Sequence, residues 1–390
     1  MNSKKVLAIL FAVMFLVMVG FGIIIPVLPF YAEELGASPT QLGLLMAVYS
    51  LMQFLFAPMW GKISDRIGRK PVLMLGIIGL SISFFMMAIA AQLWVLFAAR
   101  IIGGFLSAAN MPTVMAYVAD VTNEEDRSKG MGIIGASIGL GFIFGPAIGG
   151  VFSEQNLAIP FYLAGGSSIL TLLLVFLFLK ESLSISHESS MKQRQSIIQA
   201  LGTPLAHLFV LQWVVSVSLA GLEATFAYFA FDKVGLGTVE LGYIFMIMGL
   251  AGALVQGGLV GRMTKRFGEG QVIQIGLITS AIGFMMILFV NSFLTAALFL
   301  TIFGVGNGLI RPSVSSLLTK KATTGYGQVT GMLSSFDSLG RIIGPPLGGV
   351  LYGLAIYLPF VSGIILSILA LGIYYLYIKQ TAITTTKAES

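Results

Sequence analysis

The sequence predicts an all-α membrane protein in which two halves, each of six transmembrane helices, repeat the same arrangement. First, only 10% of its 390 residues are charged, whereas soluble proteins carry about a quarter, and the mean hydropathy is +0.95. Second, twelve apolar segments approach the length of about 20 residues that a helix needs to cross a bilayer. Third, motifs of the first half return about 200 residues later.

Short polar turns separate the apolar segments. In the first half these segments cover residues 6–30, 41–60, 71–91, 93–119, 130–152 and 160–179. In the second half they cover residues 205–231, 239–260, 271–290, 293–318, 327–351 and 357–378. The first segment continues through Pro26 and Pro29 without a small-residue cleavage site, so we interpret it as a membrane span rather than a signal peptide. Residues 180–204 form the one long polar interval, which predicts a linker between domains at 1–179 and 205–390.

The positive charges fall unevenly on the two sides of the membrane that these spans define. Three of the 22 Lys and Arg residues lie inside spans, and Lys233 is alone on one side. Because cytoplasmic loops carry the excess of Lys and Arg, both termini are predicted in the cytoplasm of a multi-pass cell-membrane protein. The net charge of +6 therefore reflects topology and does not indicate a nucleic-acid partner.

The side chains that build metal and redox sites are scarce. The chain has no cysteine, which excludes disulfides and thiolate sites, and its two histidines, His187 and His207, lie in or beside the central polar interval. We therefore expect neither a metal nor a cofactor, and we do not expect an enzyme.

The two halves share three motifs. Gly61–Lys70 joins two spans and holds five charged residues, and its Gly61, Arg66 and Gly68 recur as Gly261, Arg266 and Gly268. Met111-Pro112 recurs as Arg311-Pro312, and Gly145-Pro146 recurs as Gly344-Pro345. Since six spans return the chain to the same side, the halves are parallel repeats.

Four motifs resemble those of the major facilitator superfamily, and specifically its twelve-helix drug–proton antiporters. They are Gly61–Lys70, Gly22–Pro29 in the first span, Arg100–Gly104 in the fourth and Gly141–Gly150 in the fifth. The resemblance covers the full length and is closest to Gram-positive multidrug efflux pumps that expel fluoroquinolones and lipophilic cations. It implies the major facilitator fold, a substrate site near the membrane midplane and a proton gradient in place of a cofactor.

The resemblance also implies which residues open and close the transporter. Asp65 would lie at a helix N-terminus of the opposite half, where positive charge accumulates, and would stabilise one conformation. The alternative is a basic anchor at the membrane surface. The implied gating set is Gly61, Asp65, Arg66, Gly68, Arg69, Asp120 and Arg127, in which Asp120 and Arg127 resemble an acid–arginine pair.

The fifth span is rich in glycine. Its motif is interpreted as a bending element that sets antiport geometry, and tight helix packing is the alternative. The residues concerned are Gly141, Gly145, Pro146, Gly149 and Gly150.

Five ionisable residues lie within predicted spans: Arg100, Glu223, Arg311, Asp337 and Arg341. A charge at a helix centre costs about 2.5–3.5 kcal/mol, so each is paired or functional. Asp337 and Arg341 are four residues apart, and we predict that they pair with each other. The resemblance gives Arg100 a part in proton coupling, with hydrogen bonding to backbone carbonyls as the alternative.

Glu223 has no basic residue nearer in sequence than Lys233. Desolvation favours the protonated form of an isolated carboxylate, and this suits a proton carrier. The alternative is an ion pair with Arg311. Asn307 occupies a position where some close relatives carry a second carboxylate, so this chain has one acid there rather than two.

Soft and aromatic side chains are expected around Glu223, because methionine repacks easily and aromatic rings attract cations. The expected cavity lining is Phe226, Tyr228, Met111, Met18, Gln53 and Phe142.

The leading functional prediction is a proton-driven exporter of amphipathic, often cationic drugs that acts as a monomer in the lipid bilayer. The first alternative is a proton-coupled exporter of one physiological solute, such as a sugar, a siderophore or a lipid-like metabolite. A passive channel or scaffold is a second alternative, and the repeated charged segments and Glu223 count against it.

Overall fold

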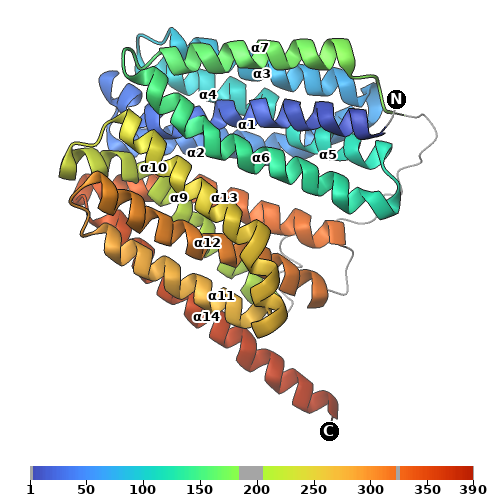
Figure 1. The fold of residues 1–390 in the computed structure, drawn as a ribbon, viewed down its shortest axis with the longest axis vertical. Helices are drawn as coiled ribbons and strands as arrows, with labels where there is room; N and C mark the ends of the chain where they lie inside the picture. Colours follow the sequence, from blue (N-terminus) through green and yellow to red (C-terminus); the bar gives the residue numbers. More distant parts are fainter. Residues whose placement is uncertain (1–2, 184–204, 322–325, 390) are drawn as a thin grey trace. The chain divides into compact units, whose positions relative to one another are not determined.

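The computed structural model describes residues 3–183, 205–321 and 326–389, and this part of the chain is helical without a β-strand (Figure 1). The first half contains α1 (Ser3–Glu34), α2 (Pro39–Ile67), α3 (Arg69–Ala88), α4 (Leu93–Ser107), α5 (Asn110–Val121), α6 (Glu124–Ser153) and α7 (Ile159–Phe178). The second contains α9 (Ala206–Val234), α10 (Thr238–Leu254), the π-helical turn η1 (Val255–Leu259), α11 (Val260–Ile287), α12 (Phe293–Lys321), α13 (Tyr326–Leu354) and α14 (Leu358–Glu389).

Ten helical stretches of the described chain are long and apolar enough to cross a membrane. One of them, Thr238–Ile287, has 50 residues and corresponds to two predicted spans. Helix α13 corresponds to the span predicted at 327–351. All twelve predicted spans therefore fall on described helices, which confirms the prediction of an all-α membrane protein.

The helices extend further than their apolar residues. Gly61–Lys70 was expected to be a loop, and this expectation is wrong: α2 continues to Ile67, α3 begins at Arg69, and only Gly68 lies between them. Residues 120–129, which separate the predicted spans 93–119 and 130–152, are likewise helical except at residues 122–123. Polar side chains do not end a helix that leaves the bilayer, whereas a glycine in the left-handed region does. Gly68 has φ 111° and separates α2 from α3, whereas Gly268, with φ 79°, lies at a kink within α11.

The described helices form two compact units. Unit 1 comprises Met1–Glu188 and Gly235–Met246, and unit 2 comprises Ser189–Val234 and Ile247–Ser390. In unit 1, α1 packs against α6 and α7, while α3 packs against α4 and α7. In unit 2, the corresponding helices form the same pairs: α9 packs against α13 and α14, while α11 packs against α12 and α14. The two halves thus repeat their packing as well as their motifs.

The predicted linker at 180–204 lies largely outside the described residues. His187 belongs to that part, and the predicted domain boundaries stay a prediction.

Each unit buries a hydrophobic core of its own. In unit 1 the core lies between α1, α3, α5, α6 and α7 and includes Leu10, Ile77 and Tyr117. In unit 2 it lies between α9, α11, α12, α13 and α14 and includes Phe209 and Ile310.

Glycines set the close approach of α1 and α6. A Cβ atom on Gly145 would lie 2.6 Å from Gly22 Cα, a distance that no side chain tolerates. In unit 2, a Cβ atom on Gly344 would lie 2.5 Å from the Val217 carbonyl oxygen of α9. Close packing is therefore one role of the Gly-Pro motifs, and the predicted bending of α6 stays a prediction.

Candidate functional site

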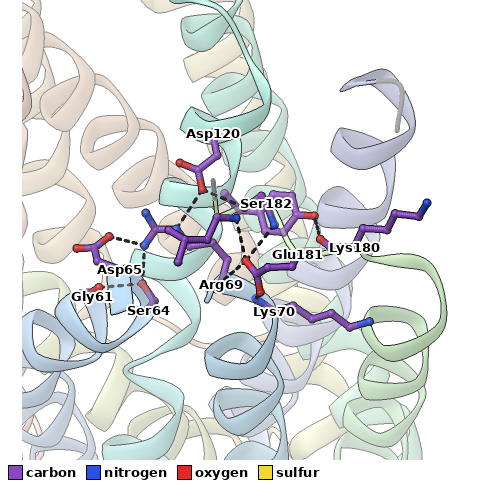
Figure 2. Close-up of polar contacts among 11 residues, drawn as sticks. Gly61, Ser64, Asp65, Arg69, Lys70, Asp120, Lys180, Glu181 and Ser182 are labelled. Carbon is purple, nitrogen blue, oxygen red and sulfur yellow. Dashed lines mark hydrogen bonds and ion pairs between the residues drawn. The ribbon is translucent and has the colours of Figure 1, made fainter. Parts of the chain in front are cut away.

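A polar cluster surrounds the turn between α2 and α3 (Figure 2). We call it the turn cluster, and it consists of Ser64, Asp65, Arg69, Asp120, Glu181 and Ser182. Arg69 is only 7% exposed and contacts every other member of the cluster except Ser182. Its Nη1 donates to Ser64 Oγ (2.8 Å) and Asp65 Oδ1 (2.5 Å), and its Nε donates to Asp120 Oδ2 (3.1 Å). Two carboxylates and a hydroxyl thus compensate one buried guanidinium.

Glu181, which follows α7, caps the start of α3. Its Oε1 accepts from the amide of Arg69 (2.8 Å) and its Oε2 accepts from that of Lys70 (3.1 Å). The amides of Ser182 and Leu183 also donate to Oε1. Partial burial of the Glu181 carboxyl opposes ionisation, but these four hydrogen bonds outweigh it and lower the pKa. A carboxylate therefore faces the positive end of α3.

Sequence reasoning missed Glu181, which it left in the linker. The only signal was an acid directly after an apolar span that ends on the same side as Gly61–Lys70. Ser182 completes the contact, since its hydroxyl donates to Asp120 Oδ2 at 2.9 Å. The end of α7 is thereby tied to α3 and α5.

The structure does not bring Asp120 and Arg127 together. Asp120 pairs with Arg69, whereas Arg127 is exposed near the start of α6, so an Asp120–Arg127 pair is wrong. The reason is that α5 ends beside the α2–α3 turn, which places the buried guanidinium of Arg69 nearer to Asp120. Gating by Asp65, Arg66 and the other members of the implied set stays a prediction.

Unit 2 repeats part of the turn cluster with opposite charges. Lys265, Glu269 and Lys320 follow Asp65, Arg69 and Asp120 by 200 residues each. Glu269 Oε1 accepts from Ser316 Oγ (3.0 Å) and forms an ion pair with Lys320. Sequence reasoning recognised the repeated glycines but missed this inversion, which a residue-by-residue comparison of the halves would have found.

Two ion pairs connect α13 to neighbouring helices within unit 2. Asp337 Oδ2 lies 2.7 Å from Arg311 Nη2 of α12. Glu223 Oε2 of α9 accepts from Arg341 Nη1 at 3.3 Å. The prediction that Asp337 pairs with Arg341 is wrong, and so is the alternative that Glu223 pairs with Arg311.

Hydrogen bonds from α9 explain why Asp337 turns away from Arg341. Asp337 Oδ1 accepts from Gln212 Nε2 (2.8 Å) and Ser216 Oγ (2.6 Å), and these two donors fix its carboxylate. Among described residues its Oδ2 has no hydrogen-bond donor, so the contact with Arg311 is electrostatic. The side chains of Asp337 and Glu223 are 12% and 15% exposed, so both pairs hold largely buried carboxylates.

In unit 1 the charge within a predicted span is Arg100 on α4, which is 6% exposed. Its guanidinium carbon lies 5.1 Å from the ring centroid of Tyr49. The Tyr49 hydroxyl is hydrogen-bonded to Ser107 Oγ (2.6 Å) and accepts from Gln53 Nε2 (2.8 Å). No carboxylate of the described chain forms an ion pair with Arg100, and its buried Nε has no hydrogen-bond acceptor among the described residues.

The expected cavity-lining residues differ in burial, and their role stays a prediction. Phe226 is fully buried and Tyr228 nearly so. Met18, Gln53, Phe142 and Asn307 are half-buried, and Met111 is exposed. No group of three His, Cys, Asp or Glu side chains that could hold a metal occurs in the described ranges.

Comparisons with known proteins agree with this architecture. The model of the Major Facilitator Superfamily matches residues 10–322 and 257–390. The chain is 32% identical to "Multidrug resistance protein 2" of Bacillus subtilis (strain 168) over 379 residues, 95% of each chain. It is 30% identical to "Quinolone resistance protein NorA" of Staphylococcus aureus (strain MSSA476) over 366 residues, 93% of each. Among solved structures, a bacterial homolog of the human lysosomal transporter Spinster, inward-facing and occupied, gives a TM-score of 0.81 at 16% identity, with 97% of each chain covered.

Proposed function

Because this chain belongs to the major facilitator superfamily and is a multi-pass membrane transporter, we propose that it exports amphipathic, often cationic drugs from the cell in exchange for protons. The observation that carries the proposal is the similarity, over 95% of both chains, to a relative named as a multidrug resistance protein. A second relative named for quinolone resistance supports the same substrate range.

Proton coupling is assigned to Glu223. Its carboxylate is largely buried in α9 and meets Arg341 at 3.3 Å, which is long for a charge-assisted hydrogen bond. Protonation would remove the negative charge and release Arg341, and deprotonation would restore the pair. Ionisable groups at membrane depth commonly serve as such relays. Asp337, held by Gln212 and Ser216, acts as the fixed partner of Arg311.

Alternating access is assigned to the two helical halves, with the turn cluster and its charge-inverted copy as the gating elements. The excess of Lys and Arg on one side supports an orientation in the cell membrane with both clusters and both termini in the cytoplasm. The proton gradient supplies the energy, so that no cofactor takes part.

Ethidium efflux from energised cells tests this function. The parent should expel ethidium against its gradient, and a protonophore should stop the efflux. Glu223→Gln, which resembles the protonated state permanently, should lose uphill efflux, while the exposed Glu154→Gln should keep it. Efflux that continues in Glu223→Gln would move the coupling site elsewhere. A parent that expels no member of a panel of unrelated amphipathic dyes would instead favour a single physiological solute.

A further inference from the structure

We propose that Arg100 binds the carboxylate of the substrate, so that zwitterionic aromatic amphipaths are preferred over purely cationic ones. This inference rests on the proposed export function and specifies its substrate class. The proposal begins from the polar contacts of Arg100 and from the charge balance of the membrane-spanning helices.

A guanidinium has five N–H donors and no acceptor. In the described chain, Arg100 lies against an aromatic ring and forms no ion pair, and its buried Nε has no hydrogen-bond acceptor, although the residue is only 6% exposed. Burial without an acceptor is costly, whereas carboxylates match the donor geometry of arginine with two parallel hydrogen bonds. The missing partner is therefore an oxyanion.

The surroundings of Arg100 hold its ring partner firmly. Tyr49 is fixed at its hydroxyl by Ser107 and Gln53, and Phe21 packs against its ring edge-to-face with centroids 5.2 Å apart. This ring supports a planar guanidinium through cation–π attraction but supplies no negative charge. Tyr49 therefore positions the Arg100 guanidinium, and a ligand can supply the hydrogen-bond acceptor that this guanidinium lacks.

The other membrane-embedded charges do not supply this acceptor. Glu223 and Asp337 each pair with an arginine inside unit 2, so the four charges of that unit cancel. Arg100 is left as the one described uncompensated charge among the five. A purely cationic substrate would add to this positive charge, whereas a substrate carboxylate would neutralise it.

Binding of matched fluorescent ligands to the protein in lipid nanodiscs tests the assignment. Norfloxacin is zwitterionic near neutral pH, its methyl ester lacks only the carboxylate charge, and ethidium is a cation that reports on the proposed drug site. The parent should bind the acid about tenfold more tightly than the ester, the size expected of a charge-assisted hydrogen-bond pair. Arg100→Gln should bind the acid and the ester about equally tightly. Arg100→Lys, which keeps the charge but loses the two-pronged geometry, should give an intermediate value.

Arg262→Gln is the matched control, because this exposed arginine forms no ion pair within the described chain. It should keep the preference of the parent. The comparison in the parent needs no variant, so the test holds even if Arg100→Gln does not fold. An ester that binds the parent as tightly as the acid, or an unchanged preference in a folded Arg100→Gln, would overturn the inference. If the parent still binds ethidium, these outcomes contradict the role of Arg100 but not the proposed drug export. A parent that binds none of the three ligands would contradict both the role of Arg100 and the proposed drug export.

Discussion

At the scale of single residues, the charges on α13 show that a buried ionisable group takes the partner that its other hydrogen bonds allow. Asp337 is one helical turn from Arg341, a spacing that stabilises pairs on isolated helices. Two donors of α9 nevertheless orient its carboxylate toward Arg311, and Arg341 reaches Glu223 instead. Burial makes the choice of partner specific, because a buried carboxylate is costly unless hydrogen-bond donors and a positive charge compensate it.

Double-mutant cycles test this pairing. Thermal unfolding of Asp337→Asn, Arg311→Gln and the double variant should show a coupling energy of about 0.5–1 kcal/mol. The value is modest because the Arg311 side chain is 60% exposed. The same cycle with Arg341→Gln should give a coupling near zero. A larger coupling with Arg341 than with Arg311 would restore the pair within the helix.

At the scale of elements, a glycine separates two long helices at the turn cluster. Gly68 has φ 111°, and a Cβ atom there would lie 2.5 Å from Glu181 Oε2, the oxygen that caps α3 at Lys70. Any other residue would therefore strain the backbone and displace the cap at once.

Three alanine variants separate strain from collision. Gly61→Ala adds a Cβ atom 3.7 Å from Pro112, which is ordinary contact, and should leave the melting temperature nearly unchanged. Gly36 has φ 82° with nothing near its Cβ position, so Gly36→Ala should cost about 1–2 kcal/mol from backbone strain alone. Gly68→Ala should cost more than either, because Glu181 must also move. Equal melting temperatures for Gly68→Ala and Gly36→Ala would show that the cap contributes nothing.

The charge-inverted copy in unit 2 makes a second prediction for elements, since Glu269 joins α11 to α12. Glu269→Lys places two ammonium groups side by side and should lower the melting temperature and the yield of folded protein. Adding Lys320→Glu recreates the pair in reverse and should recover much of the loss. Adding Lys321→Glu, one residue further along α12, should not. Equal recovery by both second changes would assign the effect to net charge rather than to the ion pair.

At the scale of the whole molecule, the absence of cysteine allows the topology to be measured directly. Ser3→Cys, Gln155→Cys and Lys379→Cys place single thiols at exposed positions near the N-terminus, between α6 and α7, and late in α14. If positive charge sets the orientation, a membrane-impermeant maleimide added to intact cells should label only Gln155→Cys. Permeabilised cells, the control, should label all three. Labelling of Ser3→Cys in intact cells would reverse the assigned orientation.

The sequence by itself determined the twelve spans, the repeat and the superfamily, because these depend on local hydropathy and on motifs that stay contiguous along the chain. It also located the five membrane-embedded charges. It did not determine the partners of Asp337 and Glu223, the cap by Glu181 or the isolation of Arg100. The contacts of Asp337 with α9, of Glu223 with Arg341 and of Glu181 with α3 join positions more than 100 residues apart. The Asp337–Arg311 pair joins two neighbouring helices, and the isolation of Arg100 depends on which groups are missing around its side chain. Only the packing of the helices against one another decides which donors and acceptors come within hydrogen-bonding distance.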